Sequence, residues 1–204
     1  MSHEDALAHA ALPAAPDLAA LVVGWLAHLR NERRLAAPTL EAYGRDVRQF
    51  LAFLTERFAA PPAAADFVGL TPGDLRAFLA RRRAQAIDGR SLQRALSGLR
   101  SLARHIEREG HGSASAFGAI RAPRAPRRLP RPLAVADAKA VASGEARAGE
   151  AREPWILARD AAVLALLYGA GLRIGEALSI KRRDAPTGDV DAVTILGKGG
   201  KTRS

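Results

Sequence analysis

Arginine is concentrated in one part of this 204-residue sequence, and the guanidinium group is well suited to binding phosphate. Residues 81–132 hold 13 basic and 3 acidic side chains, whereas residues 1–80 hold 7 and 9, and residues 133–204 hold 11 and 9. The middle of the chain therefore carries a charge excess equal to the net charge of +10. A concentrated basic block of this kind indicates a polyanionic partner.

The first part of the block is predicted to be the most regular helix of the chain. Its apolar residues recur at helical spacing and predict a buried stripe: Leu92, Leu96, Leu99, Ala103 and Ile106. The arginines that fall off this stripe, the last three on one ridge, are the expected contacts with this polyanion: Arg90, Arg94, Arg100, Arg104 and Arg108. Few acids beyond Glu107 and Glu109 match them. The alternative is an ordinary solvated helix face.

The second part of the block alternates arginine with proline. Prolines at 123, 126, 130 and 132 exclude a helix and favour a stiff, extended chain that can follow a phosphate backbone. The expected contacts on this basic strap are Arg121, Arg124, Arg127, Arg128 and Arg131. The alternative is a charged interdomain linker.

Composition narrows the class of partner. Aromatic residues make up 5% of the chain, which argues against a base-stacking surface for single strands, so duplex nucleic acid held by its phosphates fits best. The chain has no cysteine, so thiolate metal sites and disulfides are excluded. We expect no cofactor and no metal. The N-terminus does not have the pattern of a secretory signal, and no apolar run reaches the length of a membrane span, so a cytoplasmic location is expected.

A glycine- and lysine-rich turn near the end of the chain superficially resembles a nucleotide-binding loop. In Gly200-Lys201-Thr202 the spacing of a P-loop requires a further glycine at position 195, which is isoleucine here. No helix follows that turn. We therefore exclude a nucleotide site.

The elements that must position these residues are mainly α-helical. Residues 1–16 are expected to be a disordered tail, 17–110 a four-helix domain, 111–132 the basic linker and 133–204 a second region. The second helix follows Pro38 and presents Arg45 and Arg48 as further DNA contacts. In the second region we expect a short helix over 135–143, an apolar helical stretch over 155–180 broken at 169–171, and a strand over 189–196. The chain is expected to end before any returning strand.

Several segments resemble the tyrosine recombinase (phage integrase) family, particularly its bacterial Xer members. Residues 168–180 (YGAGLRIGEALSI) resemble the first catalytic box, residues 159–167 (RDAAVLALL) the helix before it, and residues 197–203 (GKGGKTR) the lysine-bearing hairpin. Residues 39–47 (TLEAYGRDV) and 91–100 (SLQRALSGLR) resemble the four-helix, SAM-like core-binding domain. The resemblance implies that this domain is followed by the beginning of an α+β catalytic domain.

The family resemblance also implies a chemistry and roles for particular residues. Such enzymes cleave one DNA strand by tyrosine attack, through a 3′-phosphotyrosyl link and without metal or nucleotide. Arg173 matches the first catalytic arginine, which stabilises charge on the phosphate oxygens. Lys198 matches the hairpin lysine that acts as general acid, and Lys201 is a further expected DNA contact. Glu176, three residues beyond Arg173 on one helical face, is expected to orient that arginine; the alternative is an exposed surface pair.

The family's later catalytic residues have no counterpart in these 204 residues. All five histidines precede Arg173, and Tyr43 and Tyr168 are interpreted as packing residues. We therefore expect a C-terminally truncated recombinase that binds duplex DNA without cleaving it, and whose family tetramer is in doubt. The alternatives are a non-enzymatic DNA-binding protein derived from a recombinase, and an RNA-binding protein suggested by the pI of 11.2. The latter does not explain Arg173 together with Lys198.

Overall fold

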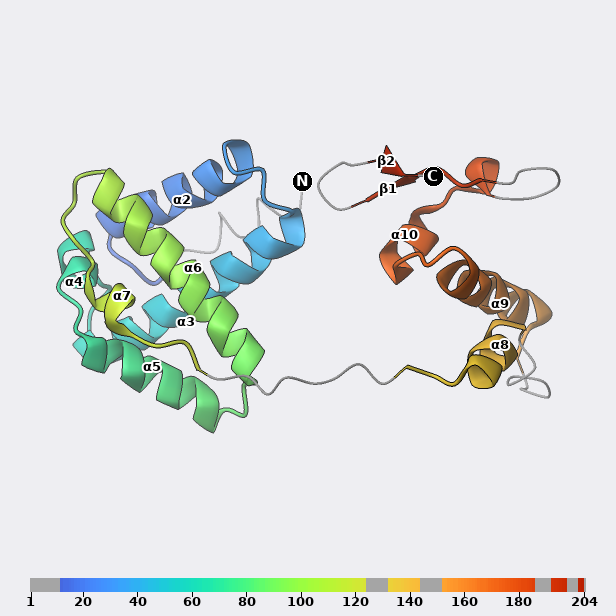
Figure 1. Cartoon of the computed structure of the whole chain (residues 1–204). Helices are drawn as coiled ribbons and strands as arrows, with labels where there is room; N and C mark the ends of the chain where they lie inside the picture. The colour runs from blue at the N-terminus through green and yellow to red at the C-terminus, as the bar shows by residue number, and fades with distance from the viewer. Residues whose placement is uncertain (1–11, 124–131, 144–151, 186–191, 198–201, 204) are drawn as a thin grey trace. The chain divides into compact units, whose positions relative to one another are not determined.

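The computed structural model describes residues 12–123, 132–143, 152–185, 192–197 and 202–203 (Figure 1). Contacts divide the chain into two units, Met1–Arg127 and Arg128–Ser204. Five of the predicted DNA contacts and the predicted general acid lie outside the described residues: Arg124, Arg127, Arg128, Arg131, Lys201 and Lys198.

The first unit is helical, and the four predicted helices are confirmed. They are α2 (Pro16–Asn31), α3 (Ala37–Phe58), α5 (Pro72–Ala84) and α6 (Gly89–Arg108). A proline occupies the first turn of α2, α3 and α5, where its missing N–H has no helical partner to lose. Two short helices that the sequence analysis missed complete the unit: α4 (Ala64–Val68) and α7 (Ala116–Ala119).

Side-chain caps define where two of the long helices begin. The Thr71 hydroxyl accepts a hydrogen bond from the Asp74 amide at 3.3 Å, and the Asp74 carboxylate accepts one from the Thr71 amide at 2.9 Å. At α6 the Asp88 carboxylate accepts from the Ser91 amide at 2.8 Å. Each cap supplies acceptors for amides that have no partner within the helix, so both starts are encoded locally.

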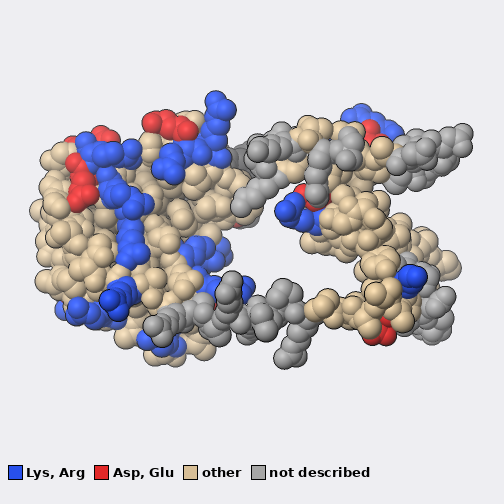
Figure 2. Space-filling view, viewed as in Figure 1, with Lys and Arg blue, Asp and Glu red and all other residues tan. Residues whose placement is uncertain are grey.

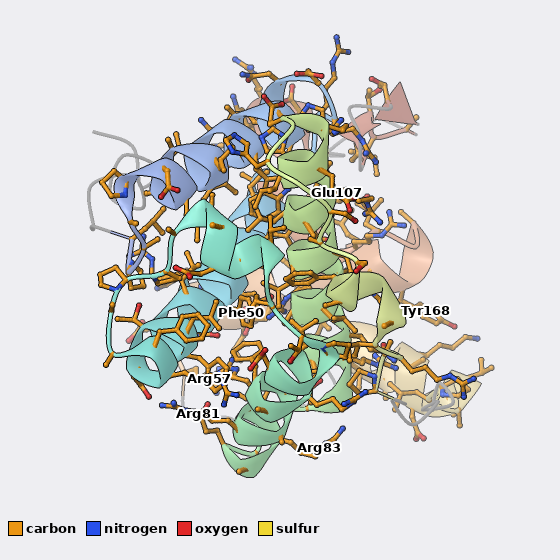
Figure 3. The ribbon with its side chains drawn as sticks, turned by 90° about the vertical axis from the view of Figure 1, so that its left-hand side faces the viewer. Phe50, Arg57, Arg81, Arg83, Glu107 and Tyr168 are labelled. Atoms are coloured by element: carbon orange, nitrogen blue, oxygen red, sulfur yellow. The ribbon has the colours of Figure 1, made fainter. Side chains whose placement is uncertain are left out.

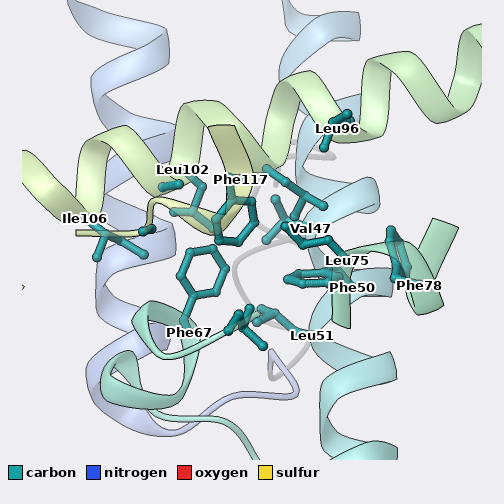
Figure 4. Packing of buried hydrophobic residues seen from close by; sticks show 14 of the residues in the cluster. Val47, Phe50, Leu51, Phe67, Leu75, Phe78, Leu96, Leu102, Ile106 and Phe117 are labelled. Carbon is teal, nitrogen blue, oxygen red and sulfur yellow. The ribbon is translucent and has the colours of Figure 1, made fainter. Parts of the chain in front are cut away.

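Helix α6 lies at the centre of the first unit and contacts α2, α3, α5 and α7. Its predicted apolar stripe is buried, and Leu92, Leu96 and Leu99 are at most 1% exposed. Below it, Phe50 of α3 lies against rings from three other helices, with ring centroids 4.9 Å from Phe78 and 6.2 Å from both Phe67 and Phe117 (Figure 4). These aromatic contacts join α3, α4, α5 and α7 into one core.

The first unit extends beyond the 17–110 domain expected from the sequence. Residues 12–15, assigned above to a disordered tail, pack on the unit, and the Thr55 hydroxyl donates to the Pro13 carbonyl at 3.1 Å. At the other end Ala114, Phe117 and Ile120 are buried in the core. The expected linker therefore begins with a packed segment, because three apolar side chains outweigh the turn-forming residues around them.

Two histidines lie between α2 and α6. The rings of His28 and His105 stack with centroids 5.7 Å apart, and His105 is 6% exposed. The His28 ring lies 2.9 Å from the Glu32 carboxylate, whereas His105 is 4.0 Å from Glu109. Burial lowers the pKa of His105, with the Glu109 carboxylate acting in the opposite direction.

The second unit contains α8 (Val135–Ser143), α9 (Pro154–Gly169), α10 (Ile174–Ser179) and a 3-10 turn (Arg182–Asp184), which confirms the predicted helical stretches and the break between them. Gly171 has φ +63°, a left-handed conformation that favours glycine and allows the chain to turn into α10. The returning strand that we expected to be missing is present. Strands β1 (Ile195–Leu196) and β2 (Thr202–Arg203) pair antiparallel, with Ile195 opposite Arg203.

Replacing Phe117 with alanine tests whether α7 belongs to the core. We expect Phe117→Ala to lower the free energy of unfolding by about 3–5 kcal/mol, because the ring is 2% exposed and its loss leaves a cavity. Phe58→Ala, at a phenylalanine that is 40% exposed, is the matched control, with an expected change of about 0.5 kcal/mol. Urea unfolding of the full chain, followed by helical circular dichroism, measures both. Equal effects would show that α7 does not contribute to the core.

The buried imidazole of His105 is expected to make stability depend on pH. Because its folded pKa lies below the unfolded value of 6.5, the unfolded chain binds more protons in mildly acidic solution. Its contribution to stability is complete above pH 6.5 and is lost as the pH falls from 6.5 through the folded pKa. Urea unfolding at a series of pH values should show a loss that His105→Gln reduces. An unchanged pH profile in that variant would assign the effect to other groups.

Candidate functional site

The exposed face of α6 carries a row of polar side chains opposite the buried stripe. Its members recur at intervals of three and four residues, with two serines between two pairs of arginines: Arg90, Arg94, Ser97, Ser101, Arg104 and Arg108. We call this row the α6 ridge. Figure 2 shows a band of basic atoms crossing the first unit over α6, with acidic atoms mainly at its upper edge. Arg90 and Arg104 form no ion pair with any described residue.

The α6 ridge differs from the predicted one at Arg100. This residue was grouped with Arg104 and Arg108, but it turns toward α7 and is half-buried. Its Nε donates to the Phe117 carbonyl at 2.9 Å, and Nη2 donates to the Ile120 carbonyl. The guanidinium thus satisfies two carbonyls at the end of α7, so Arg100 stabilises the fold and the predicted DNA contact lacks support there.

Arg94 is held by a buried acid on the neighbouring helix. Asp46 of α3 has a side chain that is 3% exposed, and it accepts from Nε of Arg94 at 2.9 Å and from Nη2 at 3.3 Å. The Arg94 side chain is itself 42% exposed. The hydrogen bond to Asp46 raises the pKa of Arg94 further above its ordinary value, so the guanidinium stays protonated. Sequence analysis missed Asp46, because nothing in its local pattern predicts that it faces α6.

A groove of about 490 Å³ extends the basic surface from α6 toward α2. Its polar lining includes His28, Arg33, Ser101, Arg104 and Arg108, together with Glu107. The Glu107 carboxylate accepts from the Ser113 hydroxyl at 2.8 Å and from the Ala114 amide at 3.0 Å. Arg33 was not predicted as a site residue, since it lies outside the basic block; the net charge of −2 for residues 1–80 obscured it.

The other predicted contacts that can be located differ in exposure. Arg45 on α3 and Arg121 after α7 are exposed, whereas Arg48 is half-buried with its Nε shielded from solvent. Arg81, the first arginine of the basic block, lies near the C-terminal end of α5, and Glu56 neutralises its charge in an ion pair (Figure 3). Arg57 forms a second ion pair, with Asp74 at 2.8 Å. The basic block therefore offers fewer free cations than its composition indicates.

In the second unit, Arg173 and Glu176 form the predicted pair. The Arg173 amide donates to Glu176 Oε2 at 2.8 Å, and its Nη1 donates to Oε1 at 2.9 Å. The reason differs from the shared helical face that we expected: Arg173 precedes α10 as its N-cap residue, and Glu176 folds back in a capping-box arrangement. The acid side chain is 9% exposed and the arginine side chain 71%, which excludes a fully exposed surface pair.

The segment that leads to Lys198 packs beside this pair. Ile195 of β1 is buried in one cluster with Leu172 and Ala177, which flank Arg173 and Glu176 in sequence. Tyr168 was interpreted above as a packing residue. Among the residues that the structure describes it is 50% exposed, so that interpretation is wrong. Tyr43 does pack, stacked on Trp25 with centroids 6.1 Å apart.

Two other kinds of site have no counterpart among the residues with described positions. The described residues include no group of three or more histidine and acidic side chains arranged to hold a metal ion. No helix within the described ranges combines the length and apolar character needed to cross a membrane.

Comparison with known families supports the fold of the first unit. Residues 22–110 match the family described as "Phage integrase, N-terminal SAM-like domain". This range covers the four long helices of the first unit almost completely. The first unit is therefore a SAM-like domain of the integrase type.

The similarity to curated proteins extends into the second unit. The tyrosine recombinase XerC of Methylobacterium nodulans is 64% identical over 189 residues, covering 93% of this chain and 58% of that protein. The corresponding XerC proteins of Methylobacterium sp. strain 4-46 and Nitrobacter winogradskyi are 60% and 56% identical, covering 94% and 93% of this chain and 60% of each relative. The chain is thus similar to tyrosine recombinases over most of its own length and spans about 60% of the length of these relatives.

Proposed function

We propose that this chain is the DNA-holding part of a site-specific tyrosine recombinase of the Xer type. The observation that carries the proposal is the α6 ridge on a SAM-like integrase domain, in a chain more than half identical to several XerC recombinases. The first unit is proposed to be the core-binding domain, and the second unit the beginning of the catalytic domain.

Duplex DNA fits the α6 ridge in shape and charge. An α-helix fits the major groove of B-form DNA, and arginines along its exposed face reach phosphates on the groove edges. Arg104, Arg108 and Arg33 line a single groove beside α6. The small side chains Ser97 and Ser101 leave room for close approach of a phosphate backbone. Membrane or single-strand binding has less support, since the ridge has no aromatic side chain among its members.

The second unit supplies part of a phosphate-activating site in this proposal. Glu176 accepts from Nη1 of the Arg173 guanidinium, whose other nitrogens donate to no residue that the structure describes and are proposed to donate to two oxygens of a scissile phosphate. Lys198 follows Ile195 by three residues, and Ile195 shares a buried cluster with Leu172. This packing supports the proposal that Lys198 acts near Arg173 as the general acid for the leaving 5′-oxygen.

We further propose that these 204 residues bind DNA without cleaving it. The chain contains two tyrosines, one packed against Trp25 and one on α9 ahead of the arginine box. A nucleophile has to attack the phosphate that Arg173 binds. The family resemblance places the nucleophilic tyrosine after the lysine hairpin in the sequence, and both tyrosines of this chain precede that hairpin. The rival proposal, a DNA-binding protein with no recombinase chemistry, gives the same prediction for this chain.

Binding to a generic 30-base-pair duplex is expected to weaken steeply with salt. Each phosphate contact contributes roughly 0.9 to the slope of log affinity against log salt concentration. The double substitution Arg104→Ala/Arg108→Ala should lower the slope by about 2 and weaken binding roughly tenfold for each arginine replaced. Fluorescence anisotropy at several salt concentrations measures both quantities.

Two further variants make this experiment specific to the α6 ridge. Arg76→Ala removes one positive charge from the exposed surface of α5, as each ridge substitution does from α6, and should change affinity by less than about twofold. Arg100→Ala should instead destabilise the fold, because it leaves two carbonyls unpaired. A slope that Arg104→Ala/Arg108→Ala leaves unchanged would show that the ridge is only a solvated face.

A suicide substrate separates binding from cleavage. We expect the chain to form no covalent adduct with a nicked duplex bearing an Xer-type recombination site, because it lacks a positioned nucleophile. Denaturing gel electrophoresis after incubation provides the measurement, with full-length XerC of Methylobacterium nodulans as the positive control. An adduct that Tyr168→Phe abolishes would overturn the expectation and identify that tyrosine as the nucleophile.

A further inference from the structure

We infer that Asp46 is a positioning residue that aims Arg94 at the edge of a DNA base, with guanine the best match. This inference rests on the proposed function, duplex DNA binding by the α6 ridge. It assigns to the pair a task that differs from that of the other ridge arginines, which contact phosphate. Burial, net charge and the donors that Arg94 retains all support this assignment.

The burial of the pair is unequal. Asp46 is almost fully buried between α3 and α6, while the Arg94 side chain remains 42% exposed. Burying a carboxylate is costly unless it is paired and hydrogen-bonded, and an apolar residue at position 46 could fill the same space without that cost. The buried acid therefore has a consequence that simple packing would not provide: it fixes the orientation of a guanidinium that faces solvent.

The donors left on Arg94 form a directional set. Asp46 uses the edge made by Nε and Nη2, at 2.9 Å and 3.3 Å. Nη1 and the second hydrogen of Nη2 donate to none of the residues with described positions and point along the opposite edge of the fork. Two parallel N–H donors match the O6 and N7 acceptors that guanine presents in the major groove.

Charge distinguishes this pair from the rest of the ridge. Arg94 and Asp46 together are neutral, so they contribute little to the release of counterions that drives phosphate binding. Arg90 and Arg104 have no acidic partner among the described residues. A neutral, rigid donor pair next to free cations suits base reading, since the cations supply affinity and the fixed fork supplies direction.

The groups around Arg94 support this division. Asp46 is the hydrogen-bonding partner from α3, and Asp88, the cap of α6, adds a weaker electrostatic interaction. Tyr43, also on α3, lies against Gly98 one turn along α6, where a Cβ atom would meet the Tyr43 ring at 3.3 Å. This close packing holds α3 and α6 together beside the pair and limits its movement.

The substitution Asp46→Asn distinguishes a purely electrostatic role of Asp46 from a role in positioning Arg94. It retains the side-chain shape and raises the net charge by one, so a purely electrostatic role for this site predicts equal or tighter binding to every duplex. Loss of positioning predicts instead a weaker preference for the favoured sequence. Glu41→Gln, an exposed acid on the same helix, makes the same charge change and is the matched control.

Selection from a pool of random 30-base-pair duplexes first identifies the sequence that the full chain favours. Affinities for that duplex and for guanine-free poly(dA-dT) duplex are then compared by anisotropy. We expect Asp46→Asn and Arg94→Lys each to lower the ratio of the two affinities roughly tenfold, with the salt slope unchanged. Glu41→Gln should leave the ratio unchanged.

The outcomes separate this inference from the proposed function. An unchanged ratio in both pair variants would overturn the inference and leave the pair a link between helices. Equal weakening of the affinities for both duplexes would overturn it in favour of a phosphate contact, because phosphate contacts carry no sequence information. Should Asp46→Asn fail to fold, Arg94→Lys keeps both charges and decides the question. A wild-type chain that binds no duplex would instead contradict the proposed function itself.

Discussion

The structure of the first unit depends on the burial of one face of α6. That helix contacts the other three long helices and α7, and each fully buried leucine in its stripe contributes about 1.5–3 kcal/mol of hydrophobic stabilisation. Because the apolar stripe occupies one side, the arginines between its members must lie on the other side or on the flanks. The position of the basic surface is thus a consequence of the same periodicity that forms the core.

The flanks of α6 show that an arginine beside a helix stripe has more than one possible role. Arg100, near the α7 side, binds two backbone carbonyls, and Arg94, near the α3 side, binds Asp46. Arg104 lies farther from both interfaces and is exposed. Angular position around the helix therefore separates Arg100, whose guanidinium is used within the fold, from the ridge arginines that keep donors exposed to a partner, although all of them belong to one run in the sequence.

Much of this organisation was predictable from the sequence, since helical periodicity and proline at helix starts are local signals. The four long helices, the break before α10 and the Arg173–Glu176 pair were all anticipated. The errors concern contacts between residues far apart in the chain. The packing of Phe117 on Phe50, the pairing of Asp46 with Arg94 and the exposure of Tyr168 depend on which segments meet in three dimensions. The short β2 strand was missed because two residues carry too little alternation to be recognised.

A buried carboxylate that holds an exposed arginine occurs in both units, through different local structures. Glu176 caps its own helix and binds an arginine three residues earlier, whereas Asp46 reaches Arg94 across a helix interface. In each case the acid lies in a low-dielectric environment, where its hydrogen bonds are strong, and the guanidinium keeps part of its donors in solvent. An arginine fixed in this way loses less conformational entropy on binding than a free one, which favours geometric selectivity over general attraction. Arg104 is exposed and forms no ion pair with any residue that the structure describes, so its charge suits the opposite task. Arginine can therefore supply both affinity and selectivity on one surface. An arginine that is hydrogen-bonded to a buried acid favours selectivity, and an exposed arginine without such a partner favours affinity.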